Sequence, residues 1–172
     1  MSEADTTYGG VEFGGGTGVP AQVLTGSIAQ NIKTQIVLNL NALVQAGIIN
    51  SVYETDLGKD PIQMTPSNGY PFAIVGMPVI TADYEDQATN KRTYKFDVLV
   101  VVSYQYLLDQ NKGVEAIIDA FLNQFDNNFT LAGASDATVL PIPVTSIPVS
   151  TATQELVCFV ANIRAQALYQ VS

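Results

Sequence analysis

One apolar stretch constrains the fold of this 172-residue chain more than any other feature. Residues 92–125, RTYKFDVLVVVSYQYLLDQNKGVEAIIDAFLNQF, read as a long strand that runs almost directly into a helix. Successive side chains of a strand face opposite sides of its sheet. One side of this strand is apolar or aromatic throughout, which predicts that helices cover it: Tyr94, Phe96, Val98, Val100, Val102, Tyr104 and Tyr106. The other side carries Leu99 and Val101 between polar ends, so the centre of the strand is apolar on both faces.

Two helices are predicted from apolar residues at helical spacing. The first begins after Ser27, with Gln30 three residues later as in a capping box, and ends before Gly47. The second spans residues 114–125, where apolar side chains recur at i, i+3, i+4, i+7, i+8 and i+11. Each helix therefore has one apolar stripe for the core.

The remaining apolar segments read as strands. Residues 48–54 form a short strand, and residues 70–86 form a longer one with a bulge or edge position at Gly76 and Pro78. A turn at 87–90 then makes a hairpin with the long strand. The proline-rich residues 138–150 suit an extended edge segment, and residues 155–171 suit a final long strand.

These elements predict an α+β fold: a mainly antiparallel sheet with two helices packed on one face, in a single domain. No third helix remains to cover the face of Leu99 and Val101, so another copy or a different protein is expected there. Residues 1–22 hold six of the thirteen glycines and read as a flexible arm before the domain at 23–172. The arm is either a disordered tail or a segment that anchors on a neighbouring subunit through Tyr8, Val11 and Phe13.

Signals for chemistry are weak. The chain has no histidine, and its one cysteine, Cys158, lies in an apolar stretch that predicts a buried, unreactive thiol. We therefore expect no enzyme activity, catalytic residue, cofactor or metal. Two groups of carboxylates favour solvated loops over a glycosidase pair or a Ca²⁺ site: Asp83, Glu85 and Asp86, and Glu54, Asp56 and Asp60.

Composition points to protein partners. Charged residues make up only 13% of the chain, so part of its apolar surface is expected to meet protein. The net charge of −9 argues against nucleic acid as a bound ligand, although DNA can pass such a surface without binding. No apolar run reaches membrane-spanning length, and the polar start MSEADTTYGG does not read as a signal peptide.

Interface residues are expected in three places. The hairpin contributes charges and one aromatic ring, the second sheet face contributes two aliphatic side chains, and the proline-rich segment contributes exposed prolines. The expected residues are Tyr84, Glu85, Asp86, Lys91, Arg92, Leu99, Val101, Pro141, Pro143 and Pro148.

The order of these elements resembles the tail terminator, or tail completion, family of tailed bacteriophages. An N-terminal helix precedes YPFAIVG at 70–76 and a charged hairpin, and a long strand then enters an amphipathic helix through LLDQNKGVEAIIDAF at 107–121. The resemblance covers residues 25–170. The glycine-rich arm and the proline-rich segment depart from the family pattern.

The resemblance implies a structural virion protein of the tail or neck, assembled in the host cytoplasm. Family members form rings, usually hexamers, that cap the tail tube, end its polymerisation and bind the head-side connector while DNA passes through. Asp83, Glu85 and Asp86 are then candidates for lumen-lining acids that repel DNA. Two alternatives stay open: another connector or tail tube subunit, and a small ligand-binding module with Tyr94, Tyr104 and Tyr106 around a pocket.

Overall fold

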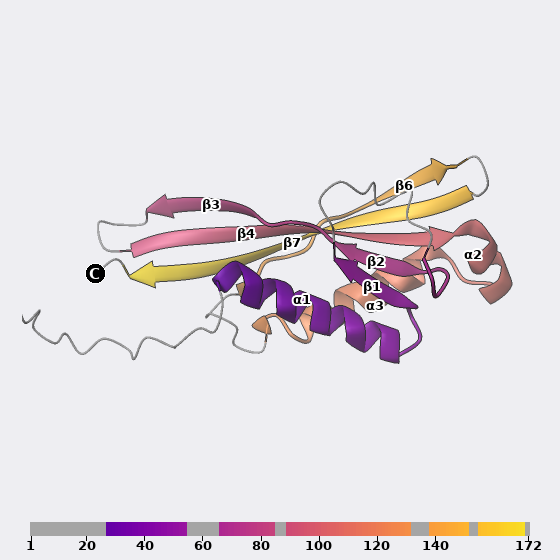
Figure 1. Cartoon of the computed structure of the whole chain (residues 1–172), viewed down its shortest axis with the longest axis horizontal. Coiled ribbons are helices and arrows are strands. Elements are labelled where there is room, and N and C mark those ends of the chain that lie inside the picture. Colours follow the sequence, from indigo (N-terminus) through magenta and orange to yellow (C-terminus); the bar gives the residue numbers. More distant parts are fainter. Residues whose placement is uncertain (1–26, 55–65, 85–88, 132–137, 152–154, 171–172) are drawn as a thin grey trace, which may run out of the picture.

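Two long antiparallel strands, β4 (Thr89–Ser103) and β7 (Glu155–Gln170), run through the centre of the molecule (Figure 1). They pair over the whole length of β4, from Thr89 opposite Gln170 to Ser103 opposite Leu156. The computed structural model describes residues 27–54, 66–84, 89–131, 138–151 and 155–170. The predicted N-terminal arm lies outside these residues.

Shorter strands complete a seven-stranded, mostly antiparallel sheet around this pair. Its main order is β1-β2-β4-β7-β5, while β3 pairs with β4 and β6 pairs with β7. Only the pairing of β1 with β2 is parallel among the described strands. The shorter strands are β1 (Ser51–Glu54), β2 (Phe72–Val75), β3 (Val79–Tyr84), β5 (Thr138–Val139) and β6 (Val144–Ser150).

Helices α1 (Ile28–Gln45) and α3 (Val114–Asp126) cover one face of the sheet, as predicted (Figure 1). The Ser27 hydroxyl accepts a hydrogen bond from the Gln30 amide at 3.2 Å, which confirms the predicted start of α1. Gly47 follows the end of α1 with φ +69°, a left-handed conformation that suits glycine. The predicted apolar stripes supply the main core, together with one side of the long strands: Ile32, Ile36, Leu40, Phe121, Phe125, Tyr94, Phe96, Val98, Val100 and Phe159.

The end of the long strand differs from the prediction. Strand β4 stops at Ser103, and residues Tyr104–Gln110 form a third helix, α2, at the end of the sheet (Figure 1). The Ser103 hydroxyl caps this helix by accepting a hydrogen bond from the Tyr106 amide at 3.1 Å. Tyr104 and Tyr106 therefore do not continue the strand face that begins at Tyr94.

The predicted strand at 70–86 is interrupted where Gly76 and Pro78 indicated a bulge. Strands β2 and β3 flank this interruption, and both pair with β4 in the same antiparallel sense. The amide of Gly76 donates to the Asp97 carbonyl at 2.8 Å, and a β carbon at Gly76 would stand 3.0 Å from that oxygen. This close approach explains the glycine at the interruption.

The second sheet face is largely covered by the chain itself, contrary to the prediction. Val101 is only 1% exposed and belongs to a second apolar cluster with Phe72, Ile74, Leu156 and Cys158. Leu99 is half-buried against the same cluster.

Residues 66–70 contribute to this cover. Pro66 is buried, the hydroxyls of Ser67 and Tyr53 lie 3.2 Å apart, and the ring of Tyr70 packs 5.5 Å from that of Phe72. Residues 66–69, which lie between the predicted strands at 48–54 and 70–86, thus fold onto the sheet. Val101 is therefore buried within the single chain.

Candidate interaction surfaces

The hairpin of β3 and β4 belongs to a three-stranded ribbon that extends away from the helices at one end of the molecule (Figure 1). We define the ribbon as β3 with residues 89–97 of β4 and 162–170 of β7. Asp83 is exposed and lies opposite Lys91 in the register, as expected for a charged hairpin. Lys91 and Arg92 are half-exposed. Tyr84 ends β3, while Glu85 and Asp86 lie outside the described residues.

One face of the ribbon is polar and rich in cations. The register places basic, acidic and uncharged polar residues together there: the basic Lys91, Lys95 and Arg164, the acidic Asp83 and Asp97, and the uncharged Thr81, Thr93, Asn162 and Gln166. Hydrogen bonds between side chains support this placement. Asn162 donates to the Asp97 carboxylate at 2.6 Å, and Gln166 donates to the Thr93 hydroxyl at 3.4 Å.

The outer edge of the ribbon is apolar and exposed. Val79 is 60% exposed and Ile80 is 51% exposed at the start of β3, and Met77 just before the strand is also exposed. Val79 lies opposite Lys95 and therefore shares the polar face, whereas Ile80 lies opposite Tyr94 on the other face. Exposed aliphatic side chains on an edge strand are typical of a surface that binds another polypeptide.

The proline-rich segment forms the opposite edge of the sheet, as predicted. Backbone groups hold it to β7: the Pro141 carbonyl accepts from the Arg164 guanidinium at 2.9 Å, and the Pro143 carbonyl accepts from the Asn162 amide at 3.2 Å. Pro148 lies within β6 opposite Val157. The side chains of all three prolines are exposed, so this edge is available for contact.

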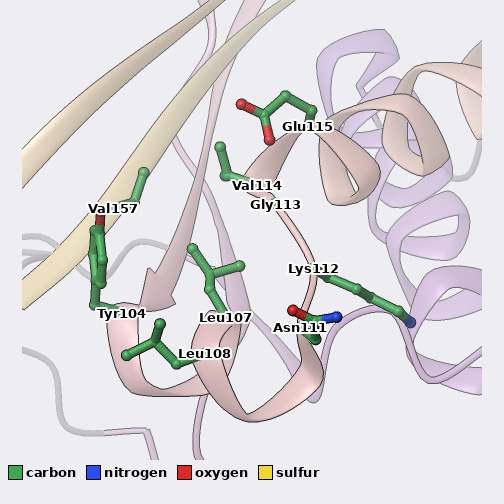
Figure 2. A pocket seen from close by; sticks show the side chains of 9 residues that line it. All are labelled: Tyr104, Leu107, Leu108, Asn111, Lys112, Gly113, Val114, Glu115 and Val157. Atoms are coloured by element: carbon green, nitrogen blue, oxygen red, sulfur yellow. The ribbon is translucent and has the colours of Figure 1, made fainter.

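A depression of about 460 Å³ lies at the other end of the molecule, between α2, the start of α3 and β7. Its apolar part consists of Tyr104, Leu107, Leu108, Val114 and Val157 (Figure 2). Leu108 is 66% exposed and Tyr104 is 50% exposed.

Two charged side chains stand at the rim of the depression. The carboxylate of Glu115 lies beside Val114, whereas the side chain of Lys112 points away from Tyr104 and Val157 (Figure 2). The charge that faces the apolar part is therefore negative. Three further carboxylates are exposed on the same two helices: Asp109, Asp119 and Asp126.

The tyrosines expected around a ligand pocket are not brought together. Tyr94 is a core residue on β4, Tyr104 lines the depression, and Ser103 at the end of the strand is nine positions after Tyr94. At about 3.3 Å per residue this separation is about 30 Å. The three rings therefore do not form one site.

Burial raises the pKa of two titratable groups, Cys158 and Tyr70. Cys158 is buried, as predicted, and burial raises the pKa of its thiol. Burial also raises the pKa of the neighbouring Tyr70 hydroxyl, with a smaller contribution from Cys158. Within the part of the chain that the structure describes, no group of three or more Cys, Asp or Glu side chains is placed to hold a metal ion.

The second predicted carboxylate group is only partly within the described residues. Glu54 ends β1 and forms an ion pair with Lys33 of α1, while Asp56 and Asp60 lie outside them. None of the described helices is both long enough and apolar enough to cross a membrane.

Comparison with protein-family models finds no match to this chain. Comparison with curated proteins finds none either. Among solved structures, the chain is similar to one described as "Virion of native gene transfer agent (GTA) particle". The two share 13% sequence identity with a TM-score of 0.44, over 86% of this chain and 100% of the other.

Proposed function

We propose that this protein is a structural virion subunit that forms a ring at the end of a phage tail tube. In this role it ends tube polymerisation and joins the tube to the head-side connector, while DNA passes through the ring without specific binding. The protein acts by binding other polypeptides and performs no catalysis.

The observation that carries the proposal is a pair of unlike apolar surfaces that lie far apart along an elongated molecule. Val79 and Ile80 begin the ribbon edge opposite Lys95 and Tyr94, near the middle of β4, and the depression with Tyr104 and Leu108 lies beyond the end of that strand, next to α2 (Figure 1). Two different patches that bind each other generate a heterologous contact, which closes into a ring when the rotation between subunits allows it. The second sheet face contributes little, since its centre is covered within the chain.

The order of elements also supports the proposal. The sequence resemblance to tail terminator proteins depends on a helix, a Pro-containing apolar strand, a charged hairpin and a long strand followed by an amphipathic helix. Each of these elements is present in that order as α1, β2, the β3–β4 hairpin, β4 and α3. Helix α2 is an addition between the last two.

We place the hairpin acids Asp83, Glu85 and Asp86 at the lumen of the ring. Carboxylates within about 8 Å of passing DNA would repel its phosphates at physiological salt. Neutralising them in D83N/E85Q/D86N is expected to leave ring formation intact and to let the ring retain DNA at low salt in a gel-shift measurement. If the variant ring releases DNA as the wild-type ring does, these acids do not line the lumen.

The proposal is tested by assembly. Native mass spectrometry and electron microscopy of the purified chain, alone and with the tail tube protein of the same particle, are expected to show closed rings on the ends of tubes. The tube protein is included because a ring can need the tube end to close. A strict monomer in both samples would overturn the proposal, and long stacks of the chain alone would instead identify a tube subunit.

A further inference from the structure

We propose that the ribbon of one copy docks into the depression of the next copy, with Val79 over the apolar floor of Tyr104, Leu108 and Val157 and with Lys95 beside Glu115. This inference rests on the proposed ring and names the contact that builds it. The occupant of the depression is therefore a second copy of this chain.

The two surfaces cannot meet within one molecule. The register places Val79 opposite Lys95, and β4 continues for eight residues from Lys95 to Ser103 before α2 begins. A strand rises about 3.3 Å per residue, so about 26 Å of rigid strand separates Val79 from the depression. Paired strands cannot fold back over that distance. A contact between the two surfaces therefore joins two copies.

The apolar parts of the two surfaces match in kind. The ribbon offers exposed aliphatic side chains on a projecting edge, whereas the depression offers exposed leucine and tyrosine around a volume of about 460 Å³. Volumes of about 300–1,000 Å³ hold ligands larger than one side chain, so the depression can receive Val79 together with its neighbours. Burial of these groups removes exposed apolar surface from both copies.

Charge favours the same pairing. Lys95 lies opposite Arg164 across β4 and β7, and like charges in that position destabilise a sheet. Asp97 is an acid on the same face, close to Lys95 and Arg164. Its carboxylate already accepts a hydrogen bond from Asn162. An additional carboxylate close to Lys95 would offset the repulsion. Glu115 supplies it at the rim of the depression, beside the apolar floor that Val79 would cover.

A heterologous contact can be tested with two variants that break opposite sides. V79D places a charge on the ribbon, and L108D places one in the depression; both side chains are well exposed, so the fold should tolerate the changes. Each variant alone is expected to raise the protein concentration required for assembly by roughly tenfold or more. Central interface residues have effects of this size. Circular dichroism checks the fold, and L38D, at an exposed leucine of α1, is the matched control.

Mixing the two variants gives the sharper measurement. The intact ribbon of L108D can dock into the intact depression of V79D, while the reverse contact is broken on both sides. A one-to-one mixture is therefore expected to form dimers and no rings in native mass spectrometry. Rings in either single variant, or an assembly defect that the mixture does not convert into dimers, would overturn this contact.

The charge pair has its own test. K95E is expected to weaken assembly, and the double variant K95E/E115K is expected to restore it, because each contact then pairs the exchanged charges. A double variant weaker than K95E would exclude Glu115 as the partner. These outcomes are distinct from failure of the proposed function, in which the wild-type chain itself forms no ring with or without tail tube protein.

Discussion

At the scale of single residues, Asn39 is the most informative polar group in the core. Its side chain is 2% exposed on α1 and links the two large helices. The amide oxygen accepts from Gln124 at 3.0 Å and from Asn128 at 3.1 Å, and the amide nitrogen donates to the Gln35 carbonyl at 2.8 Å. The helical stripe did not predict this residue, because asparagine on a helix is usually solvent-exposed.

Replacing Asn39 should therefore lower the free energy of unfolding by more than the small size of its side chain suggests. N39A leaves the amide donors of Gln124 and Asn128 without their acceptor in a part-buried site, and we expect a loss of about 1–3 kcal/mol in the free energy of unfolding. Urea denaturation measures the loss. N41A, at an exposed position of the same helix, is the control and should change stability little. Equal effects of the two variants would contradict a linking role for Asn39.

The raised pKa values of Cys158 and Tyr70 predict how the free energy of unfolding depends on pH. Burial raises the pKa of both groups, from the ordinary values of 9.0 and 10.0, so the folded chain favours their neutral, protonated forms. Their contribution to stability is then fully present below pH 9.0 and is lost as the pH rises through the raised values. We expect the free energy of unfolding, followed by urea denaturation, to fall between pH 9 and 11.

The double variant C158A/Y70F separates this effect from the general repulsion of an acidic chain at high pH. It removes both titrating groups, so its stability should decline less steeply above pH 9 even if its stability at pH 7 is lower. A decline parallel to that of the wild type would show that other groups cause the pH dependence.

At the scale of elements, the end of α1 depends on one backbone conformation. Gly47 has φ +69°, and a β carbon there would meet no atom within 4 Å, so a larger residue is opposed by the backbone alone. G47A is expected to cost about 1–2 kcal/mol in the free energy of unfolding. G47N should cost less, because asparagine tolerates the left-handed region. Thermal unfolding of the two variants measures the difference, and equal losses would contradict this explanation.

The elements that could be predicted were those whose periodicity is undisturbed over many residues. The stripes of α1 and α3 gave the correct buried residues, including Phe121 and Phe125. Helix α2 was not predicted because the alternation of apolar and aromatic side chains that begins at Tyr94 continues to Tyr106, beyond the end of β4 at Ser103. The signal that could have found it was Ser103 as an N-cap, with Leu107 and Leu108 four and five residues later.

The candidate interface was harder to predict than the core, for a physical reason. Val101 is buried in a cluster with Phe72 and Ile74 of β2 and with Leu156 and Cys158 of β7, and residues 66–70 pack beside that cluster. The periods of 2 and 3.6 residues do not reveal which strands become neighbours or which path a loop takes. The exposure of Val79 and Ile80 likewise depends on β3 being an edge strand, which sheet order alone determines. The charged hairpin and the proline-rich edge could be placed, because their residue types favour turns and edges wherever the sheet ends.

At the scale of the whole molecule, charge is distributed unevenly along its length. The ribbon strands carry two acids, Asp83 and Asp97, and four of the seven basic residues, so their net charge is +2: Lys91, Arg92, Lys95 and Arg164. Helices α2 and α3 carry no basic residue and expose Asp109, Glu115, Asp119 and Asp126. A chain with net charge −9 would repel its own copies if these charges were spread evenly. The separation lets the basic ribbon of one copy attract the acidic helices of another.

This arrangement predicts that salt controls the rate of assembly. Charges separated by more than the screening length, about 10 Å at 0.1 M salt and about 3 Å at 1 M, no longer attract. The association rate constant, followed by light scattering after dilution into different NaCl concentrations, should fall about tenfold between 0.05 and 0.5 M, as electrostatic steering does elsewhere. The apolar contact between Val79 and Leu108 is less sensitive to salt, so dissociation should change little.

Two variants with the same change of charge test this prediction against a simple effect of net charge. K95Q removes a cation from the basic ribbon, which should slow association and weaken its dependence on salt. K112Q removes a cation beside the acidic helices, and it should speed association because the surroundings of the depression become more negative. Both variants raise the net negative charge by one unit, so general repulsion would slow both equally. Opposite shifts in the two rates therefore require that unlike surfaces of two copies approach each other, as head-to-tail closure of a ring does.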